Sequence, residues 1–332
     1  MSQKHGYWRQ NYGLVALLAC AAGCGATANG AAKSHSRGVG AVAGETSTAK
    51  HQYSGDYPMP VAATTGMVAD LVARVAGRHA AVTQLMGAGV DPHLYKASTG
   101  DMAKLNRAAA IFYSGLHLEG KMGDSLARLA RKKPTVAVAE SINRGKLLEV
   151  GSDRYDPHVW FDVALWSETL SVVEKTLAEF DPVHADDYHA AAAKYRDELA
   201  ELDEHCRREL ATIPAERRVL VTAHDAFHYF GRAYDLEVKA IQGVSTQSEA
   251  GLKEINDLVS FIARRGIKAV FVESSVSERN VLALVEGCRA RGHQVAVGGE
   301  LFSDAMGKPG TPEGTYLGMV RHNVSLIVKA LK

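Results

Sequence analysis

The sequence lacks the features that mark a nucleic-acid-binding protein or a membrane-spanning protein. Its 332 residues carry a net charge of only +1 with histidine neutral, whereas a nucleic-acid-binding protein usually has a strongly basic face. An uncharged apolar run lies near the N-terminus, at residues 13–23, and it is shorter than the roughly 20 residues that cross a bilayer. We therefore expect no nucleic-acid partner, and the apolar run needs another explanation.

Cysteine is scarce beyond residue 24, where only Cys206 and Cys288 occur. Both lie in segments with helical periodicity, and we interpret them as small buried apolar residues. A disulfide between them is the alternative that the sequence leaves open. In either case the body of the protein does not depend on a dense disulfide framework.

Common catalytic signatures are missing as well. The chain contains no His-Glu-x-x-His sequence, and neither a Gly-x-Ser-x-Gly elbow nor a Gly-x-Gly-x-x-Gly loop follows a predicted strand. The composition, with 46% hydrophobic and 23% charged residues, is that of a soluble globular protein with a sizeable core. These absences favour a binding protein over an enzyme.

The N-terminus has the pattern of an export signal. Lys4 and Arg9 precede the apolar run, as in the charged and apolar regions of a secretory signal. Small residues precede both Cys20 and Cys24, and both sites resemble the bacterial lipobox, whose cysteine is lipidated and becomes the first mature residue. We favour Cys24 as the lipidated residue, with Cys20 as the alternative and an ordinary cleaved signal as a third interpretation.

We therefore expect an exported protein, periplasmic or on the cell surface, that a lipid anchors to the membrane. Residues 1–24 form the lipoprotein-type signal peptide in this interpretation. Residues 25–57 are rich in Ala, Gly, Ser and Thr and have few large apolar side chains. Such a stretch cannot bury enough surface to fold, so it is predicted to be a flexible tether.

From residue 58 onward, short apolar strands alternate with helical patterns, which predicts parallel βαβ units. One predicted helix, at 184–212, is longer than an average helix and contains no strand, so we expect it to bridge two lobes. The predicted fold class is α/β: two α/β lobes with parallel sheets, at 58–181 and 215–332, joined by one long rigid linker helix within 182–214. Strands are expected at 61–65, 81–86, 110–113, 135–139, 218–222, 237–241, 268–272 and 294–297, and the other helices at 67–76, 99–107, 118–131, 163–180, 248–265, 278–290 and 313–330, with one more ending at 234.

Metal-binding side chains follow several of these strands. His93 and His158 each end an Asp-Pro-His tripeptide, in which proline and aspartate set the turn and so the direction of the imidazole. His224 and Asp304 follow predicted strands of the second lobe. Ligands of open parallel sheets bind beyond the carboxyl ends of the strands, so we expect these four side chains to meet. Three imidazoles and one carboxylate suit Zn²⁺ or Mn²⁺.

The sequence gives weaker evidence that two further residues, Glu273 and His228, take part in the metal site. Glu273 ends a buried-looking strand, where an unpartnered carboxylate is costly, so we expect it to orient an imidazole. His228 lies one helical turn after His224 and is a candidate fifth ligand, but the residues between them do not match a zinc-protease helix. We interpret His228 as a packed or solvated helix residue and Asp225 as a charge at a helix N-terminus.

Six segments are more specific together than any one of them: DPHLY (91–95), DPHVWFD (156–162), TAHDAF (222–227), QGVST (242–246), FVESS (271–275) and GELFSDAM (299–306). In this order they resemble the TroA-like family of metal-binding proteins that serve ABC importers, and the resemblance covers residues 58–332. It implies two lobes joined by a long helix, with the metal between the lobes. His93 and His158 would be the ligands of the first lobe, and His224 and Asp304 those of the second. It also implies capture of Zn²⁺ or Mn²⁺ and delivery to an ABC transporter permease without catalysis, and we expect a monomer.

The sequence departs from two patterns of this family. Members devoted to manganese often have glutamate at the third ligand position, where this chain has His224. Many zinc-specific members have a histidine-rich loop between the first two ligands, whereas this chain has only His117 between residues 96 and 156. The two departures together predict mixed use of zinc and manganese. A zinc-dependent hydrolase and a surface adhesin of the same family are the alternative functions.

Overall fold

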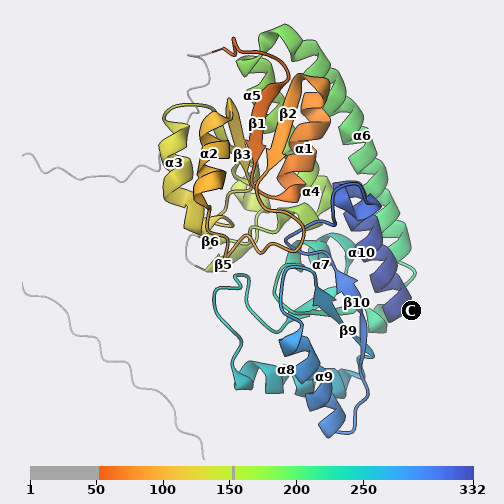
Figure 1. Cartoon of the computed structure of the whole chain (residues 1–332). Coiled ribbons are helices and arrows are strands. Elements are labelled where there is room, and N and C mark those ends of the chain that lie inside the picture. The colour runs from red at the N-terminus through yellow and green to blue at the C-terminus, as the bar shows by residue number, and fades with distance from the viewer. Residues whose placement is uncertain (1–51, 152–153) are drawn as a thin grey trace, which may run out of the picture. The chain divides into compact units, whose positions relative to one another are not determined.

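The computed structural model describes residues 52–151 and 154–332 of the chain (Figure 1). The predicted signal peptide, the candidate lipidation sites Cys24 and Cys20, and most of the predicted tether at 25–57 lie outside the described residues. Within the described part, no helix is both long enough and apolar enough to span a bilayer.

The N-terminal lobe contains a four-stranded parallel sheet in the order β2-β1-β3-β4. Its central strands are buried and apolar, as expected for parallel strands that are covered on both faces. Because the strands are parallel, their carboxyl ends meet at one edge, and the loop that carries His93 leaves the sheet there. The strands are β1 (Met59–Ala63), β2 (Ala80–Gln84), β3 (Ala110–Tyr113) and β4 (Thr135–Ala137).

Helices cover both faces of this sheet, α2 (Thr99–Arg107) and α3 (Gly123–Ala130) on one side, and α1 (Gly66–Ala76) and α5 (Leu170–Phe180) on the other (Figure 1). Local sequence fixes their ends. The Thr65 side chain caps the start of α1, and Gly77 ends the helix with a φ of 53°, which glycine adopts without strain. Ser98 and Asp101 form a reciprocal capping box at the start of α2.

The long helix α6 (Ala185–Leu210) packs on both lobes. One stripe of it is buried, which explains how a helix of otherwise polar composition is held. It contacts α1, α4 (Val163–Glu168) and α5 of the first lobe, and α10 (Tyr316–Leu331) of the second. The sequence prediction of a long bridging helix is therefore confirmed. The stripe consists of Tyr188, Ala192, Tyr195, Leu199, Leu202, Cys206 and Leu210.

The C-terminal lobe is built on two parallel strand pairs, β7 with β8 and β9 with β10, and β7 also contacts β9. Helices α8 and α9 share a separate apolar core with these strands. The largest apolar core, by contrast, runs from the first lobe into α7 and α10, so the two lobes are fused by buried contacts on that side. The elements are β7 (Val219–Thr222), α7 (His228–Tyr234), β8 (Glu237–Ala240), α8 (Leu252–Arg265), β9 (Ala269–Glu273), α9 (Arg279–Ala290) and β10 (Ala296–Leu301).

The structure corrects several predicted boundaries. The helix expected at 163–180 is interrupted at Thr169, whose hydroxyl donates to the Trp166 carbonyl (2.6 Å) and competes with the backbone. The helix expected at 118–131 begins only at Gly123, after a 3₁₀ turn. The strand expected at 294–297 instead runs from Ala296 to Leu301. Its pairing register shifts at two glycines, and these glycines interrupt the apolar pattern on which the prediction depended. The short pair β5 (Glu149–Gly151) and β6 (Arg154–Tyr155) was not predicted.

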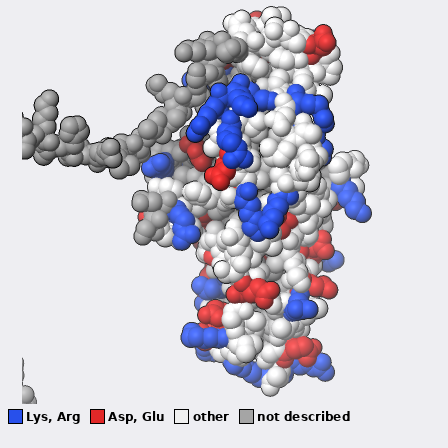
Figure 2. Space-filling view, turned by 60° about the vertical axis from the view of Figure 1, so that its left-hand side comes forward, with Lys and Arg blue, Asp and Glu red and all other residues white. Residues whose placement is uncertain are grey.

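Cys206 and Cys288 are both buried free thiols, as the interpretation of small apolar residues predicted. They belong to different apolar cores. On the face seen in Figure 2, Lys and Arg gather over the N-terminal lobe, whereas acidic and basic side chains alternate over the C-terminal lobe. The small net charge therefore does not mean that charge is spread evenly.

Candidate metal centre

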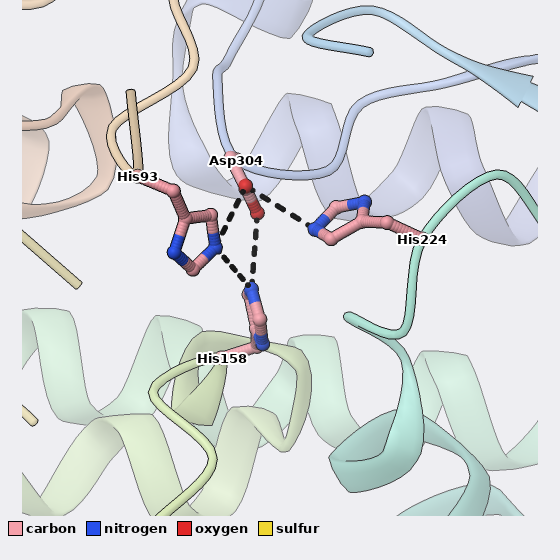
Figure 3. A group of neighbouring side chains, drawn as sticks. All are labelled: His93, His158, His224 and Asp304. Atoms are coloured by element: carbon pink, nitrogen blue, oxygen red, sulfur yellow. Dashed lines mark hydrogen bonds and ion pairs between the residues drawn. The ribbon is translucent and has the colours of Figure 1, made fainter. Parts of the chain in front are cut away.

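Three imidazoles and one carboxylate converge between the lobes (Figure 3). Each of His93, His158, His224 and Asp304 offers one ligand atom, and these atoms all lie within 4.8 Å of one another. All four side chains are buried. The structure thus brings together the four residues that the sequence singled out, from four segments that are far apart in the chain.

Each side chain comes from a loop that follows a strand. His93 lies between β2 and α2, and His158 follows β6. His224 follows β7, and Asp304 follows β10. The positions of His93, His224 and Asp304 agree with the rule that parallel sheets place ligands beyond the carboxyl ends of their strands. His158 does not follow this rule, because β6 pairs antiparallel with β5.

The four side chains approach one another closely, and only one hydrogen bond joins them, between the Nε2 atoms of His93 and His158 (3.3 Å). The Nε2 atoms of His93 and His158 lie 3.4 Å from different oxygens of Asp304, and the Nε2 atom of His224 lies 3.2 Å from the carboxylate. Among the described residues, however, both Asp304 oxygens and His224 Nε2 are buried without a hydrogen bond of acceptable geometry. Unsatisfied buried polar atoms are costly, and a cation between them would use their lone pairs.

Carboxylates behind the imidazoles set the orientation of two rings. His158 Nδ1 lies 2.7 Å from Asp156 Oδ1, and His224 Nδ1 contacts Glu273 Oε2. Glu273 also accepts the backbone N–H of His224 through its other oxygen (2.8 Å). A ring that donates its Nδ1–H to a carboxylate presents the lone pair of Nε2 to the centre, which is the form that binds metal.

The position of Glu273 was expected from its place at the end of a buried strand, but that of Asp156 was missed. Asp156 was predicted only to set the turn, and it does accept the backbone N–H of His158 (2.9 Å). The same oxygen also reaches the ring two residues later. The Asp-x-His spacing was the available signal, but Asp91 has the same spacing and does not contact its own histidine ring.

The buried charges shift the pKa values of the site in opposite directions. Burial disfavours the charged form of His158, but Asp156 and Asp304 outweigh burial and raise its pKa to about 9. Burial also opposes charge on His224, yet Glu273 and Asp304 hold its pKa well above the ordinary value. His93, where burial dominates, has its pKa lowered to about 4. Burial would raise the pKa of Asp304, but His224 and His158 hold it well below the ordinary value.

The remaining candidates lie around the centre rather than in it. His228 Nε2 lies 2.8 Å from Asp225, and its side chain is 42% exposed. It does not belong to the group of converging side chains, which agrees with its interpretation as a solvated helix residue. Trp160 is buried beside His158, and its indole N–H donates to the Ser303 carbonyl (3.1 Å), which is next to Asp304.

Comparison with known proteins gives consistent results. The family of the periplasmic component A of zinc-uptake complexes (ZnuA) matches residues 61–330. The manganese-binding lipoprotein MntA of Bacillus subtilis is 51% identical over 280 residues, which are 84% of this chain and 92% of MntA. The zinc-binding protein TroA of Treponema pallidum is 49% identical over 271 residues, 82% of this chain and 88% of TroA. The solved structure of periplasmic TroA superposes with a TM-score of 0.81 and 49% identity, covering 82% of this chain and 99% of that one.

Proposed function

Because this chain belongs to the family of the periplasmic component A of zinc-uptake complexes (ZnuA), we propose that it captures Zn²⁺ or Mn²⁺ outside the cytoplasm and delivers the ion to an ABC import permease. The family consists of metal-binding components of importers and not of enzymes. This argues against the alternative of a zinc hydrolase. No specific observation favours the adhesin alternative.

The proposed ligands of the transported ion are Nε2 of His93, His158 and His224 and the carboxylate of Asp304. The observation that carries the proposal is the convergence of these four buried groups, among which His224 Nε2 and both Asp304 oxygens have no hydrogen-bond partner in the described part of the chain. We assign Glu273 and Asp156 the role of fixing the rings of His224 and His158. Four protein ligands leave less room for a catalytic water than the three of a typical zinc enzyme.

A titration calorimetry experiment tests the ligand set. Metal-depleted protein should bind one Zn²⁺ or one Mn²⁺ per chain. His224→Ala should weaken binding by more than the ~10–100-fold that loss of an orienting partner costs. His189→Ala is the matched control, because His189 lies on α6 with a half-exposed side chain paired to Glu174. Equal loss in both variants, or wild-type affinity in His224→Ala, would refute the assignment.

MntA and TroA are nearly equally similar to this chain, and they are named for manganese and zinc respectively, so similarity does not decide between the two metals. The three imidazoles and one carboxylate favour tighter binding of Zn²⁺. Mn²⁺ stands at the weak end of the Irving–Williams order, so we propose that Zn²⁺ binds more tightly and that availability decides manganese loading. His224→Glu should narrow the difference, since it replaces an imidazole by a hard oxygen donor. Competition at equal free concentrations measures this, and Mn²⁺ displacing Zn²⁺ from the wild type would contradict it.

We propose further that lipid at Cys24, or else at Cys20, anchors a monomer to the membrane. The relative MntA is itself a lipoprotein by name, and both cysteines end a signal-like segment. Labelled fatty acid should enter the wild type and be lost in one of the two Cys→Ser variants. Incorporation that survives replacement of both cysteines would refute the anchor, and light scattering of the delipidated chain would reveal an oligomer.

A further inference from the structure

A loop of the C-terminal lobe reaches across to the loop that carries His93. This loop joins β8 to α8. The Thr246 hydroxyl donates to Asp91 Oδ2 (2.6 Å), and the Gln247 side-chain amide donates to the His93 carbonyl (3.3 Å). We call these two contacts the latch. Thr246 is buried, which strengthens a hydrogen bond to a carboxylate.

Asp91 connects the latch to the metal centre. Its other oxygen, Oδ1, accepts the backbone N–H of His93 (2.8 Å) and the backbone N–H of Leu94 (3.4 Å). The carboxylate therefore holds the turn that presents the His93 ring, while Thr246 holds the carboxylate. A second loop of the C-terminal lobe lies close by, since a Cβ added to Gly89 would come within 3.4 Å of the Ser274 carbonyl.

The latch matters because the two sides of the lobe interface are built differently. Near His158, buried aromatic side chains of α7 and α10 join the first lobe's core, and Tyr316 donates to the Trp160 carbonyl (2.6 Å). Near His93, polar contacts join the lobes: the two of the latch, and the approach of His93 Nε2 to Asp304 Oδ2 (3.4 Å). Separation of the lobes therefore meets the weaker resistance on the His93 side.

We propose that Thr246 is a positioning residue that acts through Asp91 to hold His93 on the bound ion and so slows release of the metal. The proposal rests on the function proposed above. The ion joins His93 to ligands of the other lobe, and the latch joins the same two segments. Both the bound ion and the latch favour the conformation in which the His93 loop and the C-terminal lobe are in contact. Binding of the ion therefore stabilises the latch, and the latch stabilises binding of the ion.

The test is the rate at which excess chelator removes Zn²⁺ from the loaded protein, followed by stopped-flow with a zinc indicator. Thr246→Val removes the hydroxyl and keeps the shape, and we expect dissociation to become about tenfold faster, the effect of losing one hydrogen bond to a charged group, with little change in the association rate. Thr246→Ser keeps the hydroxyl and should restore the slow rate. Ser248→Ala, an exposed hydroxyl in the same loop, is the matched control.

A second variant protects the test against a folding defect. Gln247 is exposed, so Gln247→Ala should fold normally and speed dissociation by about two- to threefold. Hydrogen exchange adds a readout that general destabilisation would not mimic, because Zn²⁺ should protect the amides of 243–251 in the wild type and much less in Thr246→Val. Dissociation rates within twofold of the wild type in both variants would overturn the latch. Absence of Zn²⁺ binding in the wild type would instead overturn the proposed function.

Discussion

The two Asp-Pro-His tripeptides of this chain have the same sequence and different surroundings. In both, the aspartate accepts the backbone N–H of the histidine, at 2.8 Å in the first and 2.9 Å in the second. In the second, Asp156 also contacts the His158 ring, and the whole tripeptide is buried. In the first, Asp91 directs its other oxygen to Thr246 in the other lobe, and its contacts with His93 are made to the backbone N–H.

The difference indicates two kinds of metal ligand in one site. His158 is held by its own carboxylate inside a packed core, and its pKa is raised to about 9. His93 is held through its backbone and through contacts that cross between the lobes, and its pKa is lowered to about 4. A fixed ligand gives affinity through preorganisation, whereas a ligand on a separable contact allows release. A transport protein needs both properties.

The largest expected difference between the two tripeptides is in the stability lost when His158 or His93 is replaced by alanine. His158→Ala leaves Asp156 buried without its ring partner, and loss of one member of a buried pair costs about 3–5 kcal/mol. We expect the free energy of unfolding of the metal-free protein to fall by about 3 kcal/mol. His93→Ala leaves no such carboxylate and should cost about 1 kcal/mol or less. Urea denaturation of both variants measures this, and equal losses would remove the distinction between the two tripeptides.

Substitution of the two aspartates, Asp156 and Asp91, should have the next largest difference in effect, on metal affinity. Asp156→Asn weakens the partner of the His158 ring, and loss of such a partner lowers metal affinity about 10–100-fold. Asp91→Asn leaves the His93 ring contacts unchanged and keeps an oxygen for the backbone N–H groups, but it removes the charged acceptor of Thr246. We therefore expect a loss of no more than about tenfold, mainly in the dissociation rate. Calorimetric titration with Zn²⁺ checks both. A larger loss in Asp91→Asn than in Asp156→Asn would reverse the assignment of fixed and releasable ligand.

The opposite pKa shifts predict a particular pH dependence. In the metal-free protein His158, with a pKa raised to about 9, and His224 hold protons at neutral pH, whereas His93 does not. Zn²⁺ must displace these protons, so affinity should rise with pH between about 6.5 and 9, by up to ~tenfold per unit for each proton released. Titrations in buffers of different ionisation enthalpy count the protons, and equal heats in all buffers would contradict the scheme.

The stability of the metal-free protein should change in the opposite direction. The pKa of His158 is higher in the folded state than its ordinary value of about 6.5, so its contribution is fully present below about pH 6.5. That contribution is lost as the pH rises through about 9. The melting temperature without metal should therefore decline between these values, while affinity for Zn²⁺ increases.

The positions of His93, His224 and Asp304 followed from the sequence because each stands after a predicted strand of a parallel pair, and parallel strands bring such ends to one edge. The Asp-Pro-His sequence was the signal for His158, since the antiparallel strand β6 before it was not predicted. The prediction of Glu273 used the same logic, since a carboxylate at the end of a buried strand needs a partner. The bridging helix was recognisable because its buried stripe repeats at three- and four-residue spacings. These features depend on local periodicity and on topology.

What the sequence did not predict depends on contacts between segments that are far apart. Asp91 and Asp156 stand in the same tripeptide, so no local rule could tell which carboxylate contacts its own ring and which contacts Thr246. Thr246 lies in a loop without periodicity, 155 positions from Asp91. The strand β10 was misplaced because Gly298 and Gly299 interrupt its apolar pattern.

The smallest expected effect concerns the size of the whole protein. The lobes share an apolar core, and α6 packs against both, so a wide opening would expose buried aromatic side chains. Small-angle scattering of metal-free and Zn²⁺-loaded protein should therefore differ little in radius of gyration. The melting temperature should nevertheless rise clearly, since ligand at a hundredfold its dissociation constant stabilises the folded state by about 2.7 kcal/mol. Thr246→Val should leave the scattering unchanged as well, because the change is confined to the loops of the latch. A large compaction on adding Zn²⁺ would mean that the lobes move as bodies and that His158 is no more fixed than His93.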